Sequence, residues 1–345
     1  MKRNFAPSVR VVLGTEFVSI TIWGKAMAIE HARAHAVPKP WGMLDLRPWS
    51  DAPQDGRPIG EIWYERHDAS ATGSSLLLKL LFTSQPLSIQ VHPDDAYARS
   101  MGLPHGKTEA WYVLSAAPEA RIALGLNQPL TPQQLREAIN TGSILDLVQW
   151  QSVAPGDTIL VPAGTIHAIG AGVVIAEIQQ RSDETFRLFD YGRQRELHVE
   201  RAIAVADAGP ANLRVTPSRL TEARTVLIAN EHFVFEKIDL PPHTAWYLEA
   251  ERETWVLVLK GNARIGSLDV GIGDAIFVQS DGTNIQSGPI GLVGLAAYTG
   301  GGPAPHFLER AKQSDAINAG PRDVGIPALI QAKAIPTDER LEIIR

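Results

Sequence analysis

The chain has 345 residues, of which 44% are apolar and 20% are charged, so it is long enough for one or two hydrophobic cores of ordinary globular composition. Its formal net charge is −6 and its basic residues form no block, which argues against nucleic acid as the main partner. It contains no cysteine, which excludes disulfides and thiolate metal sites, so a metal would need histidine, carboxylate or amide ligands.

The N-terminal segment, residues 1–36, lacks the regular pattern of the rest, and we interpret it as an extension of uncertain order. Its mildly apolar stretch is interrupted by Glu16 and Lys25, which does not fit a secretion signal. No apolar run reaches the roughly 18 residues of a transmembrane helix. We therefore expect a cytoplasmic protein with no membrane partner and no nucleic-acid partner.

The stretch from Leu87 to His92 alternates apolar and polar residues, which is the period of a β-strand. The alternation puts Gln90 and His92 side by side on one face, and Pro93 ends the strand because it has no N–H to donate. A second strand begins at Glu109. If the two strands are neighbours, an imidazole, an amide oxygen and a carboxylate converge.

The segment from Gly156 to His167 supplies a further candidate ligand. It contains a Gly-Asp turn, an apolar strand and a Pro-x-Gly turn, so His167 leaves a tight turn at the end of a strand. Three nitrogen or oxygen ligands with an open position are the usual plan of a catalytic metal site. A set of four that includes the weak amide oxygen of Gln90 fits as well.

Two helical segments interrupt the β pattern. Thr131 is followed by a proline at the first helical position and by Gln134, which predicts a capped helix and a helical insertion at about 131–150. Residues 196–207 form the second helical stretch.

These motifs resemble two known patterns. The spacing from Gly156 to His167 resembles the second signature of the cupin barrels. Gln90-Val-His92-Pro-Asp, taken together with Lys107-Thr-Glu109-Ala-Trp, resembles the type I phosphomannose isomerases in their short bacterial form. The resemblance covers roughly residues 37–300. It implies a mainly β fold of two cupin-type (jelly-roll) β-barrels, with a small helical insertion in the first.

The resemblance also implies an activity and a cofactor. Members of this family are aldose–ketose isomerases that interconvert mannose 6-phosphate and fructose 6-phosphate by proton transfer between C1 and C2 through a cis-enediol. One Zn²⁺ per chain is expected, and the matching ligand positions are Gln90, His92, Glu109 and His167. The partner is then a phosphorylated hexose, and we expect a monomer because no dimer strand is evident.

The block from Glu177 to Arg193 resembles the family's active-site strand and loop. Arg187 matches the family's active-site arginine, whose planar charge suits enediolate or phosphate oxygens. Glu177 is the first candidate for proton transfer and Asp183 the second. Glu177 could equally orient Arg187 or a metal ligand.

The residues that bind the substrate's phosphate stay open at this point. Lys107 could bind phosphate or a sugar hydroxyl, and Glu61 is a weaker match near the rim of the pocket. Arg187, Arg193 and Arg181 are the other candidates for the phosphate.

The second half of the chain repeats the first without its ligands. Glu253 and Trp255 align with Glu109 and Trp111, but Asn284 stands at the position of His167. We therefore expect a catalytic barrel over 37–215, a metal-free cupin-like barrel over 216–300 and a C-terminal tail over 301–345.

Two other functions fit the residues. Two histidines and one carboxylate can hold iron for oxygen chemistry, although Lys107 and Arg187 suit an anionic sugar better than oxygen. A non-catalytic sugar-binding bicupin is the second alternative, and an intact ligand set argues against it. The sequence leaves the native metal open.

Overall fold

A computed structural model describes residues 8–13, 16–21, 28–51, 56–67, 73–211 and 215–311. These residues are mainly β, as predicted, and form two sandwiches of cupin type. Their sheets follow open hydrogen-bonded paths in the described ranges, so the expected barrels are sandwiches rather than closed rings. No helix within those ranges has the length and apolar content needed to span a membrane.

The first sandwich consists of two antiparallel sheets. The six-stranded sheet contains, in spatial order, β11 (Thr158–Val161), β8 (Glu109–Ala116), β13 (Val173–Gln180), β6 (Leu76–Thr83), β5 (Ile59–Glu65) and β4 (Arg33–Met43). The five-stranded sheet contains β10 (Val148–Ser152), β9 (Arg121–Leu126), β12 (His167–Ile169), β7 (Ile89–Val91) and β14 (Phe186–Phe189). The apolar core between them includes Leu81, Trp111, Ile122 and Ile175.

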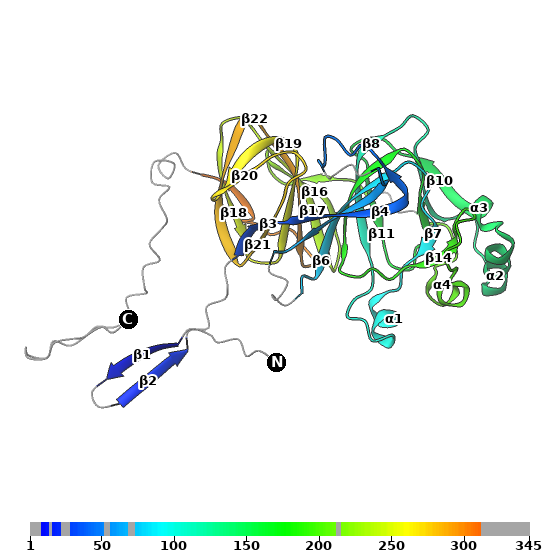
Figure 1. The fold of residues 1–345 in the computed structure, drawn as a ribbon, viewed down its shortest axis with the longest axis horizontal. Helices are drawn as coiled ribbons and strands as arrows, with labels where there is room; N and C mark the ends of the chain where they lie inside the picture. Colours follow the sequence, from blue (N-terminus) through cyan, green and yellow to red (C-terminus); the bar gives the residue numbers. More distant parts are fainter. Residues whose placement is uncertain are drawn as a thin grey trace, which may run out of the picture. The chain divides into compact units, whose positions relative to one another are not determined.

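The short helices lie on the outer face of the five-stranded sheet. Figure 1 shows α2 (Pro132–Thr141), α3 (Ile144–Leu147) and α4 (Val199–Val205) grouped beside β14, and Leu135, Ile139 and Ala202 pack there against Ile89 and Val91. The predicted capping box is present, because Thr131 Oγ1 accepts from the Gln134 N–H while the Gln134 side chain accepts from the Thr131 N–H. α1 (Asp95–Ser100) begins directly after the Asp94 cap.

Strand β6 is buried on both faces, which explains its nearly continuous apolar sequence. Leu76, Leu78, Leu80 and Phe82 face the second sandwich, where they pack with Phe235, Trp255 and Phe277. The alternate positions face the interior of the first sandwich, and Lys79 is one of them. The same strand therefore joins the two sandwiches and contributes a charged residue to the interior of the first.

The second sandwich is one continuous set of strands. Its path contains β15 (Ser218–Arg219), β16 (Arg224–Ala229), β17 (Phe233–Leu240), β22 (Asp281–Thr299), β19 (Thr254–Ile265), β21 (Ala275–Gln279) and β3 (Ala28–His31), with β18 (Ala245–Ala250), β20 (Leu268–Val270) and β23 (Leu308–Arg310) paired at its sides. Strands β19 and β22 have 12 and 19 residues, and each pairs with several neighbours along its length. Because of their length, β19 and β22 take part in both layers of the sandwich.

The start of the chain contributes to both sandwiches. Residues 28–36 belong to β3, which pairs with β21, and to β4, which pairs with β5. Strands β1 (Ser8–Leu13) and β2 (Glu16–Thr21) pair with each other antiparallel. The domain boundaries themselves stay a prediction, and residues 312–345 of the expected tail lie outside the described residues.

Glu253, which aligns with Glu109 in the repeat, fastens the second sandwich to β6. Its carboxylate accepts hydrogen bonds from the Ser74 hydroxyl and from the backbone N–H groups of Ser75 and Leu76, the last two at 2.6 and 3.0 Å. Trp255 Nε1 donates to the same carboxylate at 3.0 Å. A position that corresponds to a candidate metal ligand therefore caps the start of a strand here.

We expect Glu253→Ala to lower the free energy of unfolding by about 3 kcal/mol, because buried N–H donors lose a charged acceptor. The measurement is the shift of the urea midpoint followed by tryptophan fluorescence. Glu251→Ala is the matched control, since Glu251 is an exposed carboxylate two residues away. Equal shifts for the two variants would show that Glu253 does not fasten the sandwiches together.

Candidate metal centre and active site

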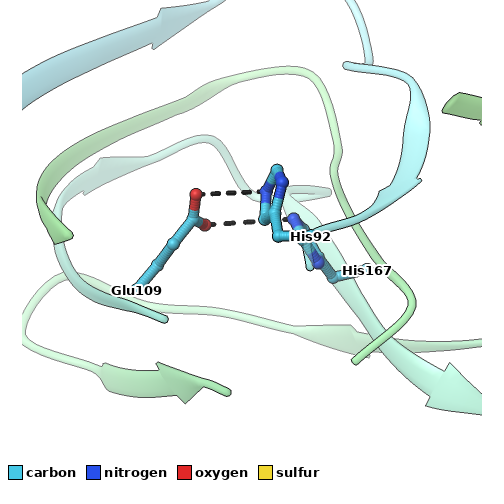
Figure 2. A group of neighbouring side chains, drawn as sticks. All are labelled: His92, Glu109 and His167. Atoms are coloured by element: carbon cyan, nitrogen blue, oxygen red, sulfur yellow. Dashed lines mark ion pairs between the residues drawn. The ribbon is translucent and has the colours of Figure 1, made fainter. Parts of the chain in front are cut away.

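Three buried side chains of the first sandwich converge on one point, as Figure 2 shows. His92 follows β7, Glu109 begins β8 and His167 begins β12, and each is 1% exposed. Their candidate ligand atoms all lie within 4.8 Å of one another. β7 pairs with β12, where His167 is opposite Gln90, and β8 lies in the other sheet. The strands of Gln90 and Glu109 are therefore not neighbours, and Glu109 meets the two histidines across the interior of the sandwich.

Hydrogen bonds to backbone carbonyls fix the tautomer of both histidines. His92 Nδ1 lies 2.9 Å from the Glu184 carbonyl oxygen, and His167 Nδ1 lies 2.9 Å from the Thr165 carbonyl oxygen. A carbonyl only accepts, so each Nδ1 carries the proton. The Nε2 atom of each neutral ring is left with its lone pair, which is the arrangement typical of metal-binding histidines.

Burial keeps both rings neutral. It lowers the pKa of His92 to about 3, with a further lowering by Lys107, and it also lowers the pKa of His167. Burial by itself would raise the pKa of Glu109, but the charge of Lys107 holds it well below the ordinary value. Lys107 Nζ lies 3.1 Å from Glu109 Oε1. The carboxylate is therefore ionised between two unprotonated nitrogens.

The three groups fit a divalent cation. His92 Nε2 lies 3.2 Å from Glu109 Oε1 and His167 Nε2 lies 3.9 Å from Glu109 Oε2, so lone pairs face lone pairs. His92 Nε2 is completely buried and has no hydrogen-bond partner among the described residues. A cation among these atoms would make the contact attractive, and imidazole nitrogens with a carboxylate are a common donor set for zinc.

Gln90 reaches the same point, as the sequence predicts for a fourth ligand. Its Nε2 lies 3.3 Å from His167 Nε2, and its Oε1 accepts from Ser88 Oγ at 2.9 Å. Rotation of the amide would exchange these roles, because a hydroxyl can also accept. The side chain can therefore offer its oxygen to the centre, and its role as a ligand stays a prediction.

Glu177 lies beside the cluster on β13 and shares a donor with it. Trp111 Nε1 is 3.1 Å from Glu109 Oε2 and 3.0 Å from Glu177 Oε2, so one indole connects the two carboxylates. Burial, and then the charge of Glu109, raise the pKa of Glu177 to about 7. A carboxyl group in this range can accept and return a proton near neutral pH.

Lys79 is a site residue that the sequence reasoning missed. It lies opposite Glu177 in the register of β6 and β13, with 3.6 Å between Nζ and Glu177 Oε1 and 3.8 Å between Nζ and Asp183 Oδ1. Its ammonium also stands 4.5 Å from the centre of the Trp63 ring. One lysine in the middle of an apolar strand was the available signal, because a buried charge needs partners.

A cavity opens beside the cluster and is lined by charged residues of both signs. Lys107, Glu61, Asp183 and Arg187 all line it, as do the unpredicted residues Lys39, Lys79 and Arg195. Trp63 Nε1 donates to Glu61 at 2.6 Å, and Lys39 Nζ lies 3.4 Å from the same carboxylate.

Arg187 has a free guanidinium nitrogen that suits an anion. Its backbone N–H donates to His198 Nδ1, but its buried Nε has no hydrogen-bond partner in the described part of the chain. Burial and the nearby Arg195 lower its pKa. By contrast, the Arg193 guanidinium bonds to Asp190 and to the Pro86 carbonyl, and neither Arg193 nor Arg181 lines the cavity.

Two cupin-type sandwiches with a buried His–Glu–His cluster define a cupin-type protein with a candidate metal centre. The chain is 38% identical over 229 residues to the mannose-6-phosphate isomerase of Streptococcus mutans, a match that spans 61% of this chain and 70% of that protein. It is 39% identical over 163 residues to the mannose-6-phosphate isomerase ManA of Bacillus subtilis, which spans 44% of this chain and 51% of that one. The chain therefore belongs to the mannose-6-phosphate isomerase family, and it is an enzyme of that family.

Solved structures share the fold. The mannose 6-phosphate isomerase from Bacillus subtilis has a TM-score of 0.68 at 24% identity, over 78% of this chain and 98% of that one. A zinc-bound mannose 6-phosphate isomerase has a TM-score of 0.63 at 15% identity, over 79% of this chain and 99% of that one. No protein-family model matches the chain.

We expect His167→Ala and Glu109→Ala each to weaken Zn²⁺ binding by more than about 100-fold, beyond the loss seen for residues that only orient a ligand. Competition with a chelator of known affinity gives the dissociation constant. His35→Ala is the control, since His35 is an exposed histidine on β4. Zinc affinity that survives in both cluster variants would place the metal elsewhere.

Proposed function

We propose that this enzyme interconverts mannose 6-phosphate and fructose 6-phosphate with one zinc ion per chain. The observation that carries the proposal is the contact of two unprotonated Nε2 atoms, of His92 and His167, with the ionised Glu109. The names of the relatives supply the reaction, and the zinc-bound structural neighbour supports the choice of metal. Gln90 is the proposed fourth ligand.

The proposed reaction is a proton transfer between C1 and C2 through a cis-enediol. It removes the proton from C2 and delivers one to C1, while O2 loses a hydroxyl proton and O1 gains one. When bound, the metal would stabilise negative charge on the sugar oxygens as a Lewis acid. The protein residues must then move the carbon-bound proton and hold the substrate.

Glu177 is the proposed proton-transfer group. Its pKa of about 7 suits a residue that takes a proton and gives it back. Trp111 Nε1 and Lys79 Nζ hold the carboxylate from two sides, at 3.0 and 3.6 Å. Asp183, which is exposed at the cavity and lies 3.8 Å from Lys79 Nζ, is the alternative.

The cavity offers cations for the phosphate and acceptors for hydroxyl groups. Arg187 is the proposed anion-binding residue, because its Nε is unpaired among the described residues. Lys107 lies beside Glu109 and is proposed to contact a sugar oxygen close to the metal centre. Asp183 and Glu61 are the proposed hydroxyl contacts.

Conversion of mannose 6-phosphate to fructose 6-phosphate by the purified chain tests the proposal. We expect activity that is lost on chelation and restored by Zn²⁺, with one zinc per chain by elemental analysis. Bound metal without isomerisation would point to other metal chemistry, such as an iron oxygenase. A protein with neither metal nor activity would be better described as a sugar-binding bicupin.

We expect Glu177→Gln to reduce kcat by about 100- to 10,000-fold, the usual contribution of a general acid–base group, while zinc content stays unchanged. The amide keeps an oxygen that can accept from Trp111 but cannot take the proton. The measurement is kcat together with exchange of the C2 hydrogen of the substrate with deuterated solvent.

Asp183→Asn is the matched variant for this test. If Glu177→Gln retains exchange and turnover while Asp183→Asn loses both, the base is Asp183, and Glu177 only orients its neighbours.

A further inference from the structure

The loop of residues 181–185, between β13 and β14, supplies the carbonyl that fixes His92. The Glu184 carbonyl oxygen accepts from His92 Nδ1 at 2.9 Å. The side chains of Asp183 and Thr185 from the same loop line the cavity. The conformation of this loop therefore determines both the tautomer of a candidate ligand and one wall of the site.

Gln179 clamps the beginning of this loop from the interior of the sandwich. It is completely buried on β13, where it lies opposite Glu109 in the strand register. Its Nε2 donates to the Ser182 carbonyl at 2.5 Å and to the Gln180 carbonyl at 3.2 Å. The Ser182 N–H in turn donates to the Gln180 carbonyl at 2.7 Å, which closes a tight turn.

The amide oxygen of Gln179 makes no hydrogen bond within the described part of the chain. Oε1 is buried and has no hydrogen-bond partner among the described residues. Both hydrogen bonds of the side chain come from the NH₂ group and go to backbone carbonyls of the turn. A buried amide oxygen without a partner is unfavourable. The hydrogen bonds of the NH₂ group to the turn are therefore the stabilising interactions that this side chain makes.

We propose that Gln179 is a positioning residue, which sets the 181–185 loop so that the Glu184 carbonyl holds the proton of His92 on Nδ1 and leaves Nε2 as the ligand atom. The inference rests on the metal centre of the proposed function. Gln179 does not line the cavity, and among the described residues it makes no hydrogen bond to the three cluster side chains. The proposal therefore assigns it an indirect role.

The alternative tautomer of His92 would make Nε2 unavailable as a metal ligand. If the Glu184 carbonyl moved away, the proton could lie on Nε2, which is 3.2 Å from Glu109 Oε1. That hydrogen bond would satisfy both atoms and occupy the lone pair that binds the metal. Retention of the Nδ1 proton therefore depends on the loop, and the loop depends on Gln179.

Other contacts keep the ends of the loop in place when Gln179 is changed. The Arg181 N–H donates to the Ser75 carbonyl at 2.8 Å, and Glu184 lies 3.8 Å from Arg201 in an ion pair at the surface. A substitution at Gln179 is thus expected to alter the turn while the strands stay paired.

The test uses Gln179→Met, which keeps the length of the side chain and removes its hydrogen bonds. In metal-free protein with ¹⁵N-labelled histidine, NMR correlation spectra report which nitrogen of His92 carries the proton. We expect Nδ1–H in the wild type and a shift toward Nε2–H in the variant. We also expect zinc affinity to fall by about 10- to 100-fold, as for other residues that orient ligands.

Gln180→Met is the matched control. Gln180 is the neighbouring buried amide, but its side chain bonds to Asp95 and to the Thr108 N–H instead of the 181–185 turn. We expect this variant to keep the His92 tautomer of the wild type. If Gln179→Met fails to fold, Gln179→Leu removes the same donors with a shorter apolar side chain.

An unchanged His92 tautomer and zinc dissociation constant in a folded Gln179 variant would overturn the proposal, as would an Nε2–H tautomer in the wild type. The tautomer is measured without metal or substrate, so it tests Gln179 even if the isomerase assay fails. Failure of that assay with the expected tautomers would instead contradict the proposed function.

Discussion

The contact between the Glu109 carboxylate and the two histidine Nε2 atoms is the constraint around which the first sandwich is organised. Three acceptors lie together in a buried site, which is unfavourable unless a cation joins them. Carbonyls of Thr165 and Glu184 hold the rings in this orientation. The surrounding structure thus holds three acceptors in an arrangement that a bound cation would make more favourable.

The six-stranded sheet supplies the groups around this contact in rows across the strands. Trp63, Lys79, Glu177 and Trp111 are successive cross-strand neighbours on β5, β6, β13 and β8. The cation and the carboxylate lie next to each other between two aromatic rings in this row, so each buried charge has a partner. The other face of β6 is apolar and packs on the second sandwich.

The repeat shows how one local geometry serves two purposes. In each sandwich a tryptophan Nε1 donates to the glutamate two residues earlier, at 3.1 Å for Trp111 and 3.0 Å for Trp255. Glu109 meets two histidines, whereas Glu253 meets the Ser74–Leu76 backbone of the neighbouring sandwich. The corresponding glutamate thus faces two histidines in the first sandwich and joins the two sandwiches in the second.

The sequence by itself determined the mainly β character and the capped helix at Thr131, because side-chain alternation and capping residues are local properties. Its motifs named His92, Glu109 and His167 as candidate ligands, but only the tertiary structure shows that they meet, because they come from two different sheets. The tertiary structure alone decided that Lys79 meets Glu177 and that Gln179 clamps the 181–185 turn. Periodicity tells which face of a strand a residue occupies. It does not tell which strand lies beside it, and in this sheet that neighbour determines the charge and the partners of each buried group.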